Sequence, residues 1–119
     1  MVAPNCNPAV IARAAQLDML CAPGVATPSE AFQALDAGAH ALKIFPAEMV
    51  GQAGLKAMRT VLPEGTALWP VGGITPDAIA PWRAAGATGF GIGSQLYAPG
   101  LDAAEVHARA LRFIGAWTG

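Results

Sequence analysis

A single lysine stands inside an otherwise uncharged apolar run. Lys43 lies in Ala41-Leu42-Lys43-Ile44-Phe45, which Pro46 ends. A lysine is costly to bury in its charged form, and an amine held neutral at the end of a strand can attack a ketone and form a Schiff base that assists carbon–carbon bond cleavage. Two alternatives stay open, because such a lysine can also extend past the strand into solvent or pair with a carboxylate such as Glu48.

Two glycine turns follow later apolar runs. Gly72-Gly73 precedes a helix start, and Gly93-Ser94 ends the next run. The free backbone N–H groups of such turns can bind an anion. Paired glycines are also common in ordinary strand-to-helix turns, but two of them on successive strands favour a phosphate site.

The elements that position these residues are read from an alternation of short apolar runs and segments of helical period. Strands are predicted at 2–4, 19–22, 41–45, 67–71 and 89–93, and helices at about 8–16, 28–37, 52–61, 76–85 and 102–117. Helix starts are marked by Asn7, by the capping box of Thr27 and Glu30, by Thr75 and by Asp102. The whole chain, residues 1–119, is predicted to be a single α/β domain of five strand–helix units.

Two parallel architectures suit this alternation, an open doubly wound sheet and part of a (β/α)₈ barrel. The glycines at 89, 91 and 93 alternate within a strand and do not match a dinucleotide-binding fingerprint. Apolar strands of this kind are expected to be covered on both faces. Because parallel strands end at one edge, Lys43 and both glycine turns should share one mouth.

Composition excludes several classes of protein. The formal charge of −1 argues against nucleic-acid partners. No apolar run approaches the ~18 residues of a membrane span, and no secretory signal is visible, so we expect no membrane partner and a cytoplasmic location. The two cysteines do not form a metal motif. The tryptophans are expected in the core or in subunit contacts: Trp69, Trp82 and Trp117. His107 is expected in solvent, and His40, which has no evident carboxylate partner, is not expected to be catalytic.

Several linked motifs resemble one enzyme family. Lys43-Ile44-Phe45-Pro46-Ala47, Pro70-Val71-Gly72-Gly73-Ile74 and Gly91-Ile92-Gly93-Ser94 are similar to segments of the class I aldolases that cleave 2-keto-3-deoxy-6-phospho sugar acids, the KDPG/KDPGal aldolase family. The segments at 2–5, 21–24 and 34–39 fall in the same order and spacing, so the resemblance runs along the whole chain.

The resemblance implies a TIM-type (β/α)₈ barrel and a reaction that yields pyruvate and glyceraldehyde 3-phosphate. In this family Lys43 would form the Schiff base, Phe45 would wall the pocket and Pro4 would shape the pyruvate site. The phosphate would be bound by Gly72, Gly73, Gly93 and Ser94. No metal or organic cofactor is implied, the partners are a phosphorylated sugar acid and pyruvate, and the expected assembly is a homo-oligomer, a trimer by resemblance.

Val71 bears on the substrate epimer. Gluconate-type members of the family tend to carry threonine at this position, and a valine cannot hydrogen-bond a substrate hydroxyl, so the galactonate-derived substrate is favoured. Two alternatives stay open: the gluconate epimer as substrate, and a non-catalytic phosphate-binding or assembly module.

The chain departs from the family at its start. It resembles the family from the fourth strand onward, so about three of the barrel's units are not matched. The family's general acid/base glutamate, its substrate-binding arginine and a pyruvate-site threonine have no counterparts here. Open strand edges at 2–4 and 89–93 are expected to seek partners, either copies of this chain or further parts of a longer polypeptide.

Overall fold

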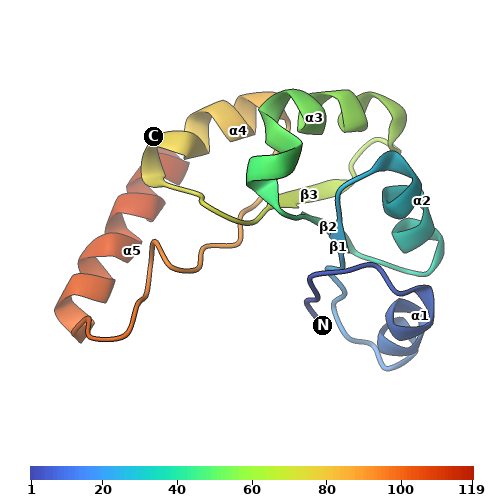
Figure 1. Ribbon diagram of the computed structural model, residues 1–119, viewed down its shortest axis with the longest axis horizontal. Helices are drawn as coiled ribbons and strands as arrows, with labels where there is room; N and C mark the ends of the chain where they lie inside the picture. The colour runs from blue at the N-terminus through green and yellow to red at the C-terminus, as the bar shows by residue number, and fades with distance from the viewer.

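The computed structural model describes residues 1–119 and has an α/β architecture built on a parallel sheet (Figure 1). Its three strands are neighbours in chain order: β1 (Gly24–Val25), β2 (Ala41–Ile44) and β3 (Ala67–Pro70). All pairings are parallel. Isolated parallel bridges extend the sheet on both sides, one joining Val2 to Ala22 and the other joining Val71 to Gly91.

The order of the strands distinguishes the two expected architectures. Each extended segment lies beside the next one in the sequence, whereas a doubly wound sheet reverses its strand order at a switch point. The helices follow the same progression and form an arc from α1 to α5 around the sheet (Figure 1). The predicted parallel α/β fold is therefore confirmed, and the open doubly wound arrangement does not match the observed order.

Two of the five predicted strands are reduced to single bridges, and a third is displaced. The segment at 19–22 contributes only the bridge residue Ala22, and β1 begins after Pro23, which has no N–H to donate to a ladder. The segments at 2–4 and 89–93 lie at the edges of the sheet, where each has a neighbour on one side only. Three strands are thus observed, and they do not close into a barrel.

The helices are α1 (Pro8–Gln16), α2 (Pro28–Asp36), α3 (Ala47–Val61), the 3₁₀ helix η1 (Pro76–Ala78), α4 (Ile79–Ala85) and α5 (Ala103–Thr118). Three predicted caps are confirmed, because the side chains of Asn7, Thr27 and Asp102 accept hydrogen bonds from backbone N–H groups of their helices. Thr75 precedes η1 without a side-chain cap, contrary to prediction.

Helix α3 begins at Ala47, well before the predicted start near residue 52. Gly51 explains the difference. It adopts φ +70° and ψ 168°, which breaks the helical pattern and leaves a separate first turn at 47–50. This first turn lies directly after β2, so it brings Glu48 to the same edge of the sheet as Lys43.

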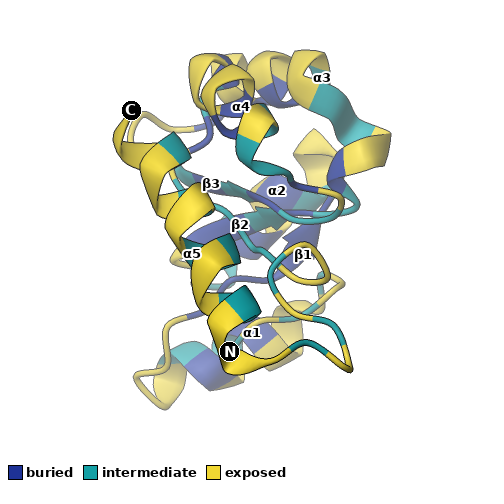
Figure 2. Ribbon diagram, turned by 90° about the vertical axis from the view of Figure 1, so that its left-hand side faces the viewer, coloured by how far each residue is buried: buried dark blue, intermediate teal, exposed yellow.

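The core lies between the sheet and the surrounding helices. Alternate strand residues such as Leu42, Ile44 and Leu68 are fully buried, whereas Lys43 and Trp69 on the opposite face are only half-buried (Figure 2). The expectation that both faces are covered is therefore met fully on the helix side, whereas the face of Lys43 and Trp69 is covered only in part. None of the helices combines the length and apolarity needed to cross a membrane.

Candidate active site

The carboxyl ends of the strands form one edge, and the predicted site residues lie there. Phe45 follows β2 directly, and Val71 follows β3 and leads into Gly72 and Gly73. Gly93 lies two residues beyond the bridge between Val71 and Gly91. This common edge is a consequence of the parallel pairing, and it juxtaposes segments from different parts of the chain.

The amine of Lys43 lies against an aromatic ring. Its Nζ atom is 4.4 Å from the centroid of the Phe45 ring, a distance at which a cation or an amine is attracted to the ring face. Both side chains are half-buried. Lys43 forms no ion pair, since the ion pairs of the chain join Glu105 to arginines. The alternative in which Lys43 pairs with Glu48 is therefore not observed.

Pro4 lies on the other side of β1 from Lys43. The register pairs Gly24 with Lys43, and the N–H of Gly24 donates to the carbonyl of Asn5 at 3.2 Å. A Cβ atom on Gly24 would overlap the carbonyl of Pro4, so glycine is required for this close backbone approach. The glycine thus holds the exposed Pro4 at the same edge as Lys43.

The turn after β3 is shaped by left-handed glycines. Gly72 has φ +114° and Gly73 has φ +64°. The N–H of Ala47 donates to the carbonyl of Val71 at 2.9 Å, which fixes the start of α3 beside this turn. A Cβ atom on Gly73 would lie 2.7 Å from Oε1 of Glu48, so the Glu48 carboxylate borders the turn.

The sequence suggested Glu48 only as a possible ion-pair partner of Lys43 and did not predict that it borders the Gly72-Gly73 turn. Its contact with the Gly72-Gly73 turn depends on the early start of α3, and the only local signal is its place soon after Pro46. Trp69, expected as core or as a subunit contact, is paired in register with Lys43. The sequence could have suggested this neighbour only if the strand register were known.

The second glycine turn is less constrained. The N–H groups of Leu96 and Tyr97 donate to the carbonyl of Gly93, at 2.9 and 3.1 Å, and form a tight turn that includes Ser94. Gly93 and Ser94 are exposed. A Cβ atom on Gly93 would meet no atom within 4 Å. The backbone therefore does not require glycine here, and the phosphate-binding role of this turn stays a prediction.

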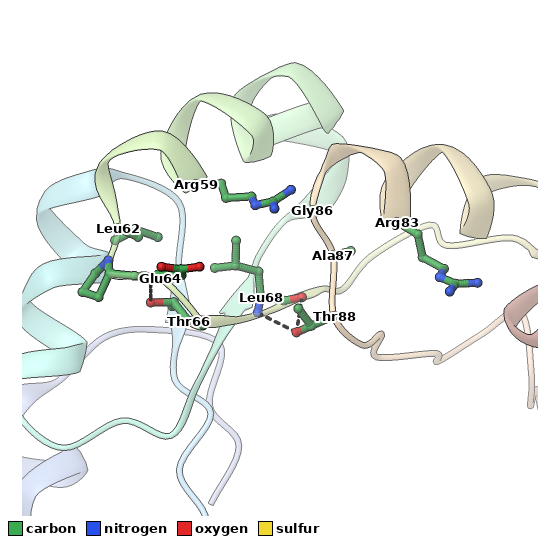
Figure 3. Close-up of a pocket in the computed structure, with 11 residues that line it drawn as sticks. Arg59, Leu62, Glu64, Thr66, Leu68, Arg83, Gly86, Ala87 and Thr88 are labelled. Carbon is green, nitrogen blue, oxygen red and sulfur yellow. Dashed lines mark hydrogen bonds between the residues drawn. The ribbon is translucent and has the colours of Figure 1, made fainter.

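A cavity of about 410 Å³ lies at the opposite end of the sheet (Figure 3). It is lined by the start of β3 and by the carboxyl ends of α3 and α4. The Arg59 side chain packs on Gly86, which ends α4, a favourable place for a cation. Thr88 accepts a hydrogen bond from the N–H of Leu68 at 3.0 Å. These contacts stabilise helix and strand ends away from Lys43.

Other titratable groups have structural surroundings. Nδ1 of His40 accepts a hydrogen bond from the N–H of Cys21 at 3.0 Å, so this imidazole fixes a loop. The N–H groups of Ala26 and Thr27 donate to Glu30 and hold its pKa below the ordinary value. Desolvation, together with the charge of Glu30, raises the pKa of the Cys6 thiol. None of these groups supplies a nucleophile to the mouth.

Comparison with known proteins agrees with this geometry. A native KDPGal structure superposes with a TM-score of 0.96 at 44% sequence identity, covering 98% of this chain and 57% of that one. A probable 2-dehydro-3-deoxy-6-phosphogalactonate aldolase of Rhizobium meliloti (strain 1021) is 45% identical over 117 residues, 98% of this chain and 55% of the relative. The 2-dehydro-3-deoxy-6-phosphogalactonate aldolase of Escherichia coli (strain K12) is 44% identical, with 98% and 57% covered.

The chain thus spans somewhat more than half the length of the curated relatives that it matches. The sequence profile of the KDPG and KHG aldolases matches residues 1–110, which include every segment that ends at the mouth described above. Because this match covers most of the chain, and relatives above 40% identity span nearly all of it, the protein belongs to the KDPG and KHG aldolase family.

Proposed function

We propose that this chain supplies the Schiff-base portion of an aldolase that cleaves 2-dehydro-3-deoxy-6-phosphogalactonate to pyruvate and glyceraldehyde 3-phosphate. The observation that carries the proposal is the amine of Lys43, which lies 4.4 Å from the Phe45 ring without a carboxylate partner. An amine in this position is free to react with a carbonyl carbon, and the half-buried aromatic ring excludes water from one side of it.

In the proposed reaction the Lys43 amine adds to the C2 ketone, and loss of water gives a protonated imine. Removal of the proton from the C4 hydroxyl breaks the C3–C4 bond and releases the aldehyde. The electron pair of that bond passes into the imine and forms an enamine, which takes a proton at C3. Hydrolysis then releases pyruvate and restores the lysine.

The base for this proton transfer is not assigned to a residue of this chain. The family resemblance puts it on a glutamate in the part of the relatives that this chain does not match. A general acid–base group contributes on the order of 10² to 10⁴ in rate. We therefore expect imine formation by this chain alone to be easier to detect than complete turnover.

The phosphate of the substrate is proposed to lie across the two glycine turns. Gly72 and Gly73 have positive φ angles, a backbone conformation found in anion-binding turns, and the Gly93-Ser94 turn lies on the neighbouring segment. Pro4 is proposed to border the pyruvate moiety from the other side of Lys43. These roles rest on position at one edge of the sheet.

A complete (β/α)₈ barrel is the proposed working fold. Both ends of the helical arc expose apolar side chains, among them Val10 on α1, Leu17 directly after α1, and Leu111 and Ile114 on α5. Helix α5 contains no fully buried residue. The unmatched part of the relatives would cover these surfaces. Homo-oligomeric assembly, as a trimer, and a cytoplasmic location are proposed with it, and the free thiols of both cysteines are compatible with a reducing compartment.

Val71 and the similarity to two 2-dehydro-3-deoxy-6-phosphogalactonate aldolases favour the galactonate-derived substrate. Val71 is half-buried beside the Gly72-Gly73 turn and offers no hydrogen-bonding group to the C4 hydroxyl. The competing substrate is the gluconate epimer. A direct comparison of cleavage rates for the two epimers separates them, and a preference for the gluconate epimer would contradict the role given to Val71.

The proposed nucleophile is tested by reducing the chain with borohydride in the presence of pyruvate. We expect one reduced adduct, located at Lys43 by peptide mass spectrometry and lost in Lys43→Met. The chain provides a matched control, since Lys56 is an exposed lysine on α3 and Lys56→Met should keep the adduct. Absence of the adduct together with phosphate binding would favour the non-catalytic module.

A further inference from the structure

Trp69 is the cross-strand neighbour of Lys43. The parallel register of β2 and β3 pairs the two residues, so their side chains leave the sheet on the same face. Both are half-buried, whereas Leu42 and Leu68, one position earlier on each strand, are sealed under the helices. The indole therefore lies on the face that carries the reactive amine.

The indole extends over the next segment of the sheet, where a glycine leaves room for it. A Cβ atom on Gly89 would lie 2.8 Å from both Cδ1 and Nε1 of Trp69. Two residues further on, a Cβ atom on Gly91 would lie 2.5 Å from Cγ2 of Val71. The glycines at 89 and 91 thus leave room beside β3 for the side chains of Trp69 and Val71.

We propose that Trp69 is a positioning residue, which packs beside Lys43 and is held in place by the room that Gly89 leaves for its indole ring. The inference rests on the proposed function, because it names a residue that supports the same amine. In this role the Trp69 side chain, which is beside Lys43 in the register of β2 and β3, restricts the four-carbon stem of Lys43 to the side where its Nζ lies over Phe45.

Loss of the indole would open a space beside the stem of Lys43. The flexible stem can then turn toward β3 and withdraw the amine from the mouth. Catalytic groups depend on placement to within about 1 Å, and a misplacement of that size costs up to about 10²-fold in rate. The position of the amine, and not only the stability of the fold, should therefore respond to Trp69 and to Gly89.

The chain contains an internal reference for this test, because Lys43 and Lys56 are its only lysines. The full chain is treated with limiting acetic anhydride, and the ratio of acetylation at Lys43 to that at Lys56 is measured by mass spectrometry. Trp69→Ala should lower this ratio at least threefold, and Trp69→Phe should restore most of it. Trp117→Ala removes an exposed indole elsewhere and should leave the ratio unchanged.

A double-mutant cycle isolates the contact. Gly89→Ala should lower the ratio when Trp69 is present, because the new Cβ displaces the indole, and should have little effect in a Trp69→Ala background. Circular dichroism confirms that each variant is folded. If Trp69→Ala does not fold, Trp69→Leu and Gly89→Ala provide the same comparison. An unchanged or increased ratio in the folded variants would overturn the proposal.

Borohydride trapping with pyruvate is measured on the same variants. A wild-type chain that forms no pyruvate adduct, but shows the expected labelling ratios, would contradict the proposed aldolase and leave the role of Trp69 intact. Normal trapping, together with acetylation ratios that do not change in the Trp69 and Gly89 variants, would contradict only the role of Trp69. The two failures are therefore distinguishable.

Discussion

Replacement of Gly73 by alanine tests the conformation of the proposed phosphate turn. Gly73 has φ +64°, a left-handed conformation that costs an L-residue roughly 1–2 kcal/mol. The added Cβ would lie 2.7 Å from Oε1 of Glu48, but this carboxylate ends a flexible, exposed side chain and can move aside. We therefore expect Gly73→Ala to lower the free energy of unfolding by about 1–2 kcal/mol, nearly all of it from the backbone.

The assay is urea denaturation followed by circular dichroism. In a thermal melt, a loss of about 1 kcal/mol lowers the melting temperature of a domain somewhat smaller than this one by roughly 4–8 °C. Gly93→Ala is the matched control, since a Cβ there meets nothing within 4 Å, and it should change stability by less than about 0.5 kcal/mol. Glu48→Ala should recover little of the Gly73→Ala loss. Equal stability of wild type and Gly73→Ala would refute the left-handed turn.

Three further predictions concern the core and the start of α2. Leu42→Ala should lower the free energy of unfolding by about 2–5 kcal/mol in urea titrations, because Leu42 is fully buried between sheet and helices. The pKa of Glu30 is lowered in the fold, so the contribution of its carboxylate to stability is present above the unfolded pKa and is lost as the pH falls through the folded pKa. Glu30→Gln should therefore lower the free energy of unfolding at neutral pH and lower it much less at about pH 2. Cys6, whose pKa is raised, should react with iodoacetamide more slowly than a cysteine peptide at neutral pH, and Glu30→Gln should speed this reaction, as measured by mass spectrometry.

Local signals predicted the starts of α1, α2 and α5 well, because a cap is decided within one turn. Asn7, Thr27 and Asp102 each accept hydrogen bonds from N–H groups two or three residues away. The edge strands were predicted less well, because a strand is completed by a partner that the local sequence does not specify. The run at 89–93 is bonded to β3 on one side only, and a single bridge remains.

The candidate site also combines a residue that the local sequence reveals with a residue that only strand pairing places. Lys43 stands out in the sequence because it is a charge in an apolar run, but its neighbour Trp69 is set by the register of two strands. That register is fixed by the opposite face, since slipping one strand by one residue would bring Leu42 or Leu68 out of the core. The burial of these leucines therefore determines which residue lies beside the amine. Substitutions on the sealed face that shift the register should thus affect imine formation without touching any residue at the mouth.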